Sequence, residues 1–364
     1  MGLSVGIVGL PNVGKSTIFN ALTAAGAQSA NYPFCTIEPN VGIVPVVDQR
    51  LIKLASLADS KQTVYTDLKV VDIAGLVRGA SQGEGLGNQF LANIRETDAI
   101  LHVVRCFVDP NVIHVEATID PERDIEIVET ELMLADLDAI IKRLDRVGRL
   151  ARVGQKDAQP MADALTKASE AIDKGIPLRA VDFTDEEKSS LRELNLITMK
   201  PVLFVANVAE SDLGGDSDLV KKVRRIGGDK NGEVVVICGE LEAQIAQLPP
   251  EERKEFLGEM GLLEPGLDLL IRAAYKLLGL ETFFTAGPKE ARAWTIRCGS
   301  RAPQAAGVIH SDFERGFIRA ETIAYGDYIG LGGEQAAKAA GKMRSEGKEY
   351  EVQDGDVILF RFNV

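Results

Sequence analysis

The feature that most constrains this 364-residue chain is a glycine-rich loop from Gly9 to Thr17, which reads GLPNVGKST. It fits the pattern G-x-x-x-x-G-K-[S/T] and lies between an apolar segment, residues 3–8, and a helical pattern from Lys15 to about Ala25. In a strand–loop–helix unit of this kind, backbone N–H groups and the helix N-terminus surround the phosphates of a nucleotide. The loop therefore predicts a nucleoside triphosphate site within an α/β fold.

Two residues of the loop, and two further along the chain, have predictable roles at the phosphates. We expect the Lys15 ammonium to reach the β and γ oxygens and the Ser16 hydroxyl to bind Mg²⁺. Asp72 closes the apolar segment 67–72 in the run Asp-Ile-Ala-Gly, which ends at Gly75. An aspartate there can hold Mg²⁺ through water, and the Gly75 N–H can donate to the γ-phosphate.

Thr36 lies between these two segments, in the run from Phe34 to Asn40. A threonine at this place would complete the metal shell, as switch threonines do. An ordinary loop hydroxyl is the alternative. Its neighbour Cys35 is a candidate redox-sensitive thiol, but the charges that would activate a thiol are not visible in a sequence.

Other apolar segments indicate how the sheet continues. Residues 99–106, 202–207 and 234–238 are expected to be buried strands, and the alternation with helical segments predicts a mostly parallel sheet covered on both faces. An α-helical hairpin is expected as an insertion at about residues 125–198, where apolar residues recur at helical spacing: Leu137, Ile141, Leu144, Val147, Met161, Leu165, Ala168 and Ile172. Packing within the hairpin explains these stripes, and a partner surface is the added alternative. Thr184 and Glu187 predict a capping box for a further helix.

Two domains are expected, a nucleotide-binding domain of residues 1–280 and a small α+β domain of residues 281–364. Within the second, strands are expected near 293–297, 317–323, 350–352 and 356–362, with helices near 304–310 and 334–345. A helix from about Pro265 to Leu278 should end near Gly279.

Charge is distributed unevenly along the chain, whose formal net charge is −13. Residues 281–364 hold 11 Lys and Arg against 12 Asp and Glu, which leaves 30 against 42 in the remainder. The acidic body would repel naked nucleic acid. Contact with an RNA particle is therefore expected through the C-terminal part, and no sequence-specific DNA partner is expected.

Composition also predicts where the protein works. No apolar run approaches the roughly 20 residues needed to span a bilayer, and the N-terminal segment has no basic region typical of a signal peptide. The four cysteines lie far apart and form no CxxC pair, which argues against zinc and disulfides. We expect a cytoplasmic protein with reduced thiols and no membrane partner.

The run from Asn207 to Glu210 is expected to read the purine. Guanine-reading sites of this kind end as Asn-Lys-x-Asp, whose carboxylate accepts from guanine N1 and N2, whereas this chain has Asn-Val-Ala-Glu. A longer acid is misplaced for that pair of bonds, and the loss costs guanine more than adenine, which has no donor at N1. The sequence therefore favours ATP. The alternative is that Glu210 only caps the following loop and the base is guanine.

A second glycine-rich segment carries a family resemblance. Five glycines lie between Gly75 and Gly87, in a run that resembles the DxxGLxxGAxxGxGLG motif of the Obg family. Such a segment can order and disorder with the γ-phosphate. With Asn207–Glu210, Asn31–Asn40, Ile94–Glu96 and Phe283–Gly287, essentially the whole chain resembles the Obg-like ATPases, the YchF subfamily of the Obg family of P-loop (TRAFAC) NTPases.

The resemblance implies an OBG-type nucleotide-binding domain with a helical insertion, the A domain, followed by a TGS domain with a ubiquitin-like fold. It also implies Mg²⁺, a preference for ATP over GTP, binding to the ribosome or its large subunit, and a regulatory role. It assigns nucleotide contacts to Asn12, Val13, Gly14, Lys15, Ser16, Thr17, Asn207 and Val208, and Mg²⁺ to Ser16 and Thr36. Cys238 and Gly239 stand where a fifth base-contacting loop would be, although Cys-Gly-Glu departs from the usual Ser-Ala-Lys.

The attacking water needs a catalyst other than the residue usual in GTPases, because Leu76 takes the place of a glutamine. The resemblance points to His114, whose imidazole could orient water at neutral pH. An exposed polar residue on a short strand is the alternative, and His102, inside an apolar strand, is expected to be structural. Intrinsic turnover should be slow, on the order of 10⁻⁴ to 10⁻² s⁻¹. Potassium is a candidate activator, with Asn12 as a ligand.

Three functional hypotheses follow. The first is a ribosome-associated switch ATPase. The second is an Obg-class GTPase that reads guanine despite Glu210. The third is a nucleotide-gated adaptor, in which hydrolysis is incidental and the hairpin and C-terminal domain bind partners.

Overall fold

The computed structural model describes residues 3–29, 40–73, 79, 86–112, 114–116, 118–153, 155, 158–230 and 232–363. Its contacts divide the chain into two compact units, Met1–Val44 with Lys69–Ala274 and Pro45–Leu68 with Tyr275–Val364. Residues 45–68, which the sequence predicted within the first domain, therefore group with the C-terminal unit. None of the helices in the described ranges is long and apolar enough to cross a membrane.

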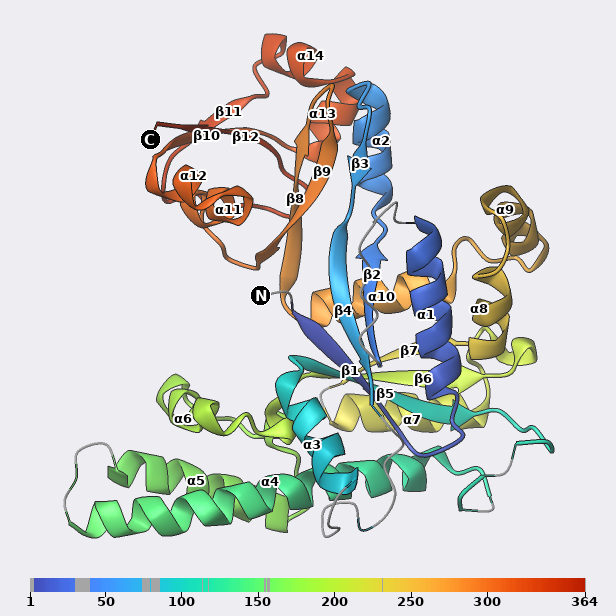
Figure 1. The fold of residues 1–364 in the computed structure, drawn as a ribbon, viewed down its shortest axis with the longest axis vertical. Helices are drawn as coiled ribbons and strands as arrows, with labels where there is room; N and C mark the ends of the chain where they lie inside the picture. Colours follow the sequence, from blue (N-terminus) through green and yellow to red (C-terminus); the bar gives the residue numbers. More distant parts are fainter. Residues whose placement is uncertain are drawn as a thin grey trace. The chain divides into compact units, whose positions relative to one another are not determined.

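The first unit is built on a six-stranded sheet in the order β2-β4-β1-β5-β6-β7 (Figure 1). Its strands are β1 Ser4–Val8, β2 Val41–Val46, β4 Thr66–Asp72, β5 Ala99–Cys106, β6 Val202–Val208 and β7 Glu233–Ile237. The pairs β4–β1, β1–β5, β5–β6 and β6–β7 are parallel, which confirms the predicted sheet. Every residue of β1, β5 and β6 is buried, as expected for parallel strands covered on both faces.

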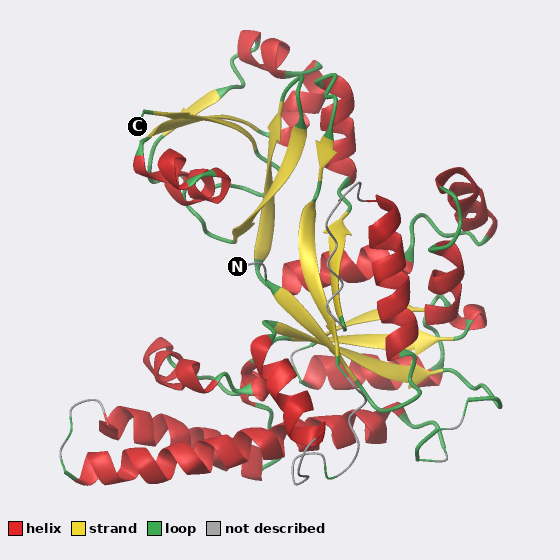
Figure 2. Ribbon diagram, viewed as in Figure 1, coloured by secondary structure: helices red, strands yellow, loops and turns green. Residues whose placement is uncertain are grey.

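Helices lie on both sides of this sheet (Figure 2). Outside the insertion, the helices of this unit are α1 Lys15–Ser29, α3 Leu86–Glu96, α7 Asp218–Asp229, α8 Gly239–Ile245, α9 Pro250–Glu259 and α10 Gly266–Leu277. Helix α10 ends two residues before Gly279, whose φ of 64° is in the left-handed region, as the sequence predicted.

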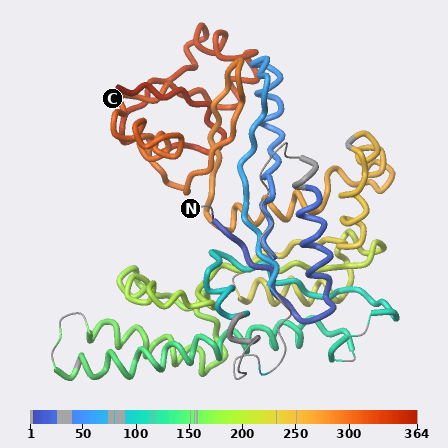
Figure 3. The backbone as a smooth tube through the Cα atoms, viewed as in Figure 1, coloured from blue at the N-terminus to red at the C-terminus, as the bar shows by residue number. Residues whose placement is uncertain are grey.

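The predicted helical hairpin is present between β5 and β6, where the chain leaves the sheet and returns to it (Figure 3). It consists of α4 Pro121–Arg152 and α5 Ala158–Asp173, followed by η1 Leu178–Ala180, α6 Asp185–Leu191, η2 Arg192–Leu194 and η3 Ile197–Met199. The apolar stripes pack against each other, with Ile140, Val147 and Leu165 buried between them. Ile141 of the first stripe is 47% exposed, and a partner surface on the hairpin is a prediction that this exposure supports. The predicted capping box of Thr184 and Glu187 is confirmed.

A buried cluster fixes the hairpin where it returns to the sheet. Asp136 on α4 accepts hydrogen bonds from the backbone N–H groups of Ile197 and Thr198 at 2.9 and 2.7 Å. Arg95, at the end of α3, places Nη1 3.2 Å from Asp136 Oδ1 and also donates to the carbonyl oxygen of Ala135. Burial raises the pKa of Asp136, and these hydrogen bonds oppose the rise. Helix α3 and the hairpin therefore share one polar anchor.

The second unit has a mixed six-stranded sheet in the order β11-β10-β12-β8-β9-β3. Its strands are β3 Thr63–Val64, β8 Leu280–Ala286, β9 Ala291–Arg297, β10 Phe317–Ile323, β11 Arg344–Glu346 and β12 Val357–Phe362. Its helices are α2 Gln49–Leu57, α11 Ala302–Ile309, α12 Ser311–Arg315, α13 Tyr325–Leu331 and α14 Glu334–Ala339. Strand β8 pairs antiparallel with β9 and parallel with β12.

Two predicted elements of this unit are wrong. The helix expected at 334–345 stops at Ala339 because Gly341, with a φ of 70°, takes the left-handed conformation that ends helices, and β11 follows. The strand expected at 350–352 is only an isolated bridge from Glu351 to Arg301. There the Tyr350 hydroxyl instead donates to Asp356 Oδ2 at 2.6 Å.

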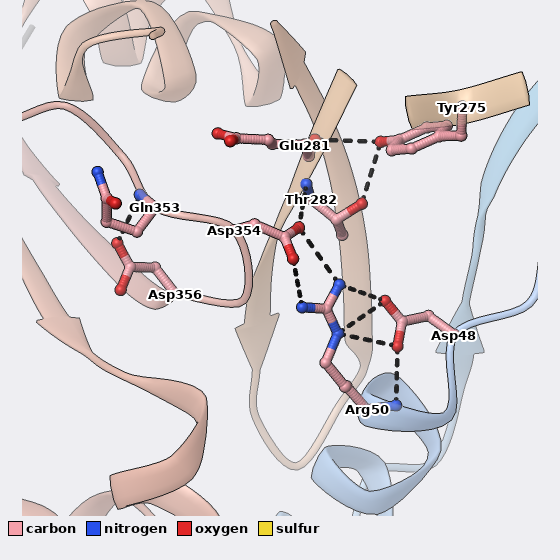
Figure 4. Close-up of polar contacts among 8 residues, drawn as sticks. All are labelled: Asp48, Arg50, Tyr275, Glu281, Thr282, Gln353, Asp354 and Asp356. Atoms are coloured by element: carbon pink, nitrogen blue, oxygen red, sulfur yellow. Dashed lines mark hydrogen bonds and ion pairs between the residues drawn. The ribbon is translucent and has the colours of Figure 1, made fainter. Parts of the chain in front are cut away.

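An arginine explains why residues 45–68 belong with the C-terminal unit (Figure 4). Arg50, in the first turn of α2, donates to the N-cap carboxylate of Asp48 and, through Nη1, to Asp354 Oδ2 at 2.6 Å. Asp354 Oδ1 also accepts the backbone N–H of Thr282 in β8 at 3.0 Å. The apolar residues Leu51 and Leu54 pack with Phe284 in one core. The segment is therefore held by both polar and apolar contacts.

We expect His102 to make the stability of the first unit depend on pH. The ring is 2% exposed inside β5, and burial lowers its pKa to about 3, with positive charges such as Arg179 adding to the effect. Because the unfolded chain binds a proton below about pH 6.5 and the folded chain does not, stability falls as pH drops through this range. Between pH 7 and pH 5 the residue should remove about 2 kcal/mol from the free energy of unfolding.

Urea unfolding of wild type and His102→Leu at both pH values checks this expectation. Circular dichroism is the suitable signal, because the only tryptophan, Trp294, lies in the other unit. The loss on acidification should be smaller in the variant by that amount. Equal losses in both proteins would contradict it.

Candidate nucleotide site

The loop between β1 and α1 has a backbone that few side chains would tolerate. Gly9 and Gly14 have φ values of 154° and 96°, and Asn12 is left-handed at 61°. A Cβ atom on Gly9 would lie 2.5 Å from the carbonyl oxygen of Val103, and one on Gly14 would collide with the side-chain amide of Asn207. The two glycines of the motif are therefore required both by conformation and by space.

Lys15 is held inside this loop. Its Nζ donates to the carbonyl oxygen of Leu10 at 2.6 Å, and the residue is only 6% exposed. Burial lowers the pKa of Lys15 to about 8, and the charge of Asp72 opposes the change. The Lys15 ammonium therefore lies within the phosphate loop, and it gives up its proton more readily than an exposed lysine does.

The residues predicted to hold Mg²⁺ fit a divalent cation as far as they are described. Ser16 Oγ lies 3.4 Å from Asp72 Oδ2. Asp72 Oδ1 is buried and has no hydrogen-bonding partner among the described residues. Burial raises the pKa of Asp72, while Lys15 and Ser16 lower it. A hydroxyl beside an unpaired carboxylate oxygen is a donor set that Mg²⁺ uses. Thr36, Cys35, Gly75 and Leu76 lie outside the described residues.

Asn207 links three segments of the site. Its Nδ2 donates to the carbonyl oxygen of Val13 in the loop at 2.9 Å, and its Oδ1 accepts the N–H of Gly239 at 2.9 Å. The side chain is buried at the end of β6. Predicted as a base contact, Asn207 therefore also fastens the phosphate loop to the start of α8.

A pocket of 670 Å³ opens beside the loop at the carboxyl ends of the strands. Three walls form it: the loop and Asn207–Glu210, the segment after β5, and one face of α8. The lining residues are Gly14, Thr17, Phe107, Val108, Asp109, Pro110, Val112, Asn207, Val208, Ala209, Glu210, Glu240, Ala243, Gln244 and Gln247. Cys238 and Gly239, which the sequence assigned to a base-contacting loop, do not line the pocket; Glu240, Ala243 and Gln244 of α8 line it instead. Burial raises the pKa of the Cys238 thiol, which makes it a poor nucleophile.

Sequence reasoning missed Arg105, which is 1% exposed near the end of β5. Its guanidinium donates to the carbonyl oxygens of Phe107, Asp109 and Val112 at 3.2, 3.3 and 3.0 Å. The signal was available, because a lone arginine in a strand of otherwise buried residues needs internal partners.

His114 is buried rather than exposed on a strand. Its Nε2 lies 2.8 Å from Asp124 Oδ2, and its Nδ1 accepts the backbone N–H of Glu116 at 3.1 Å. Arg123 Nη2 lies 2.8 Å from the other carboxylate oxygen, Asp124 Oδ1. Both ring nitrogens are engaged, so in this arrangement His114 cannot orient a water molecule without giving up one of these contacts.

A buried lysine in a strand–loop–helix unit, a serine beside an aspartate at the end of the neighbouring strand, and a pocket beside the loop define this protein as a P-loop nucleoside triphosphatase. A family model described as 50S ribosome-binding GTPase matches residues 4–208. A second, for the C-terminal part of YchF GTPases and described as a protein of unknown function, matches residues 280–363.

Curated relatives named "Ribosome-binding ATPase YchF" from Bacillus subtilis strain 168 and Escherichia coli O157:H7 are each 56% identical to the chain. The alignments cover all of this chain and all of each relative. A solved structure titled "Structure of the Schizosaccharomyces pombe YchF GTPase" is 36% identical, covers 99% of this chain and 98% of that chain, and has a TM-score of 0.88. The chain belongs to the YchF family of Obg-like P-loop NTPases.

We expect nucleotide affinity to fall at alkaline pH because of Lys15. Its pKa of about 8 means that the ammonium loses its proton above that pH, whereas bound phosphates favour the charged form. Affinity should be flat from pH 7 to pH 8 and then fall by up to about tenfold per pH unit. Isothermal titration with ADP in two buffers of different ionisation enthalpy should report proton uptake at pH 8.5. Lys15→Arg is the control, because its guanidinium stays charged and its ADP affinity should not change with pH in this range. A wild-type ADP affinity that stays constant up to pH 9.5 would contradict the expectation.

Proposed function

We propose that this protein hydrolyses ATP to ADP and phosphate, slowly and with Mg²⁺, as a cytoplasmic regulatory switch that binds ribosomes. The single observation that carries the choice of ATP is the purine-reading run Asn207–Glu210, which keeps the asparagine but replaces the lysine and the aspartate of a guanine site. The bacterial relatives are named ribosome-binding ATPases, which supports both the nucleotide and the partner.

The described geometry of Glu210 agrees with an adenine reader. Glu210 is exposed and begins the short helix η4 Glu210–Asp212 directly after β6, at the rim of the pocket. Guanine needs a carboxylate that accepts two hydrogen bonds, and an exposed glutamate must give up more side-chain entropy than an aspartate to supply them. Asn207 and Val208 line the pocket beside the phosphate loop and are assigned to the base.

At the phosphates, Lys15 supplies a charge to the β and γ oxygens, and backbone N–H groups from Asn12 to Thr17 surround them. Ser16 and Asp72, with Thr36, would hold Mg²⁺, which neutralises charge on these oxygens when it is bound. Gly75 is assigned to the γ-phosphate. Potassium activation stays a separate prediction, tested by comparing rates in potassium and sodium buffers.

His114 is assigned to orient the attacking water after it leaves Asp124. The buried pair holds the ring by a 2.8 Å contact, so release of His114 costs free energy before each turnover. A slow intrinsic rate follows. A ribosomal partner that stabilises the released ring would raise the rate by removing that cost.

A regulatory role is supported by two contacts that join the second glycine-rich segment and its helix to the hairpin. The Gly79 N–H donates to Glu131 Oε1 on α4 at 2.6 Å, and Arg95 on α3 pairs with Asp136 on the same helix. If the glycine-rich segment from Gly75 to Gly87 changes conformation with the γ-phosphate, the change would be transmitted to α4 through these contacts. In this proposal the insertion at about 125–198 is the A domain and residues 281–364 form the TGS domain.

Competition binding of ADP against GDP tests the nucleotide assignment, and a strong preference for GDP would replace it with the GTPase hypothesis. Sedimentation of the protein with ribosomes in sucrose gradients, with ATP, with ADP and without nucleotide, tests the switch. Equal cosedimentation in all three conditions would reject nucleotide control of binding. Cosedimentation that depends on nucleotide without any measurable hydrolysis would favour the adaptor.

A further inference from the structure

The buried guanidinium of Arg105 is the feature with no role in the chemistry above. It uses four of its five N–H groups on backbone carbonyl oxygens. Three are in the segment after β5, and the fourth is that of Asn12 in the phosphate loop, 3.4 Å from Nη1. The guanidinium carbon also lies 4.5 Å from the centre of the Phe107 ring. One side chain thus holds residues 107–112 and touches the back of the phosphate loop.

The segment that Arg105 holds is one wall of the pocket. Phe107, Val108, Asp109, Pro110 and Val112 all line it, and none of them lies in a helix or strand. Three of the described hydrogen bonds of this segment come from Arg105. The others close a turn in which Asp109 accepts the N–H groups of Asn111 and Val112. Without the guanidinium the wall would lose its common support.

From this geometry we infer that Arg105 is a positioning residue for the purine: it holds residues 107–112 in the conformation that receives the base and ties that wall to the phosphate loop. The inference rests on the assignment of the pocket to the base of the proposed nucleotide. Arg105 is not among the residues that line the pocket. It acts by preorganisation. If residues 107–112 had to become ordered when the nucleotide binds, the lost conformational entropy would weaken the affinity.

Preorganisation of the base wall has a distinctive consequence, because it affects the base and not the phosphates. The measurable quantity is the ratio of the dissociation constant of pyrophosphate to that of ADP, both with Mg²⁺, which isolates the contribution of the nucleoside. In Arg105→Met this ratio should fall at least about tenfold, because several residues become free to move in the unbound protein. Pyrophosphate affinity should stay within about threefold of wild type.

Two variants make the test specific. Arg105→Lys keeps the charge but not the planar fork of donors, so its ratio should lie between those of wild type and Arg105→Met. It also serves if Arg105→Met does not fold, as judged by circular dichroism. Arg143→Met is the matched control, because Arg143 donates to Glu193 within the helical insertion, and neither residue lines the pocket. Its ratio should match wild type.

A double-mutant cycle with Phe107→Ala adds a second line of evidence. Phe107 lines the pocket and contacts the guanidinium, so its removal should lower the ratio by itself. In the Arg105→Met background the further loss should be less than about threefold, because the wall is already released. Full additivity of the two losses would contradict coupling between them.

Isothermal titration of ADP, GDP and pyrophosphate gives every quantity needed. A parallel loss of ADP and pyrophosphate affinity in Arg105→Met would overturn the inference and make Arg105 a support of the phosphate loop alone. Unchanged affinities would overturn it as well. Failure of the proposed function is recognised separately: if the wild type prefers GDP, the choice of adenine is wrong, and the same ratio measured with GDP still tests Arg105.

Discussion

Replacing His114 with alanine is expected to lower the rate constant of ATP hydrolysis by about 10²- to 10⁴-fold, the usual contribution of a side chain that positions or deprotonates a reacting group. The dissociation constant for ATP should change by less than about threefold, because His114 is not among the residues that line the base pocket or form the phosphate loop. Single-turnover phosphate release and equilibrium binding measure the two quantities separately.

The control is His310→Ala, which removes a histidine whose side chain is 60% exposed in the other unit. Its hydrolysis rate should equal that of wild type. If His114→Ala hydrolyses ATP at the wild-type rate, the catalytic assignment is wrong, and the buried pair with Asp124 is a structural contact. Retained ribosome binding by such a protein would strengthen the adaptor hypothesis.

Replacing Lys15 with methionine should lower kcat/KM for ATP by about 10²- to 10³-fold. The variant keeps the unbranched stem but loses the charge that meets the β and γ oxygens as negative charge develops on them. Lys15 is buried in the loop, where few water molecules screen that charge. Steady-state kinetics and titration with ATP check the expectation.

Lys142→Met is the matched control for loss of a positive charge, because Lys142 is 74% exposed on the hairpin and pairs only with Asp138 among the described residues. Its kcat/KM should be unchanged. Hydrolysis by Lys15→Met within tenfold of wild type would mean that the loop does not use its lysine at the transition state. The proposed phosphate chemistry would then need another cation.

Much of the first unit could be predicted because its signals are local. The strand Ala99–Cys106 was predicted at the bounds that the structure has, since a buried parallel strand is apolar on both faces and shows as a continuous run. The capping box at Thr184 and the helix end before Gly279 depend on a few neighbouring residues. The prediction of a helix at 334–345 was wrong for a local reason too, because Gly341 was not recognised as the residue that ends it.

The candidate site was predictable only in part. The roles expected for Lys15 and Ser16 follow from an eight-residue motif, and the structure places Ser16 beside Asp72. Arg105 could have been noticed as an arginine within an apolar strand, but its partners could not be predicted, because hydrogen bonds to carbonyl oxygens leave no mark on the residue types that supply them. The buried contact of His114 with Asp124 was likewise invisible, although the two residues are only ten positions apart.

By itself, the sequence determined the phosphate loop, the order of the strands along the chain and the helical insertion, because each depends on spacing among near neighbours. Only the tertiary structure decided that Asn207 fastens Val13, 194 positions away, to the start of α8, and that residues 45–68 join the C-terminal unit through Arg50. These outcomes depend on which groups meet when the chain compacts. Asn207 is buried and must find partners once water is excluded, whereas Arg50 and Asp354 stay partly exposed and pair beside the core that Leu51 and Leu54 share with Phe284. In both cases the partners are chosen by proximity in space rather than along the chain.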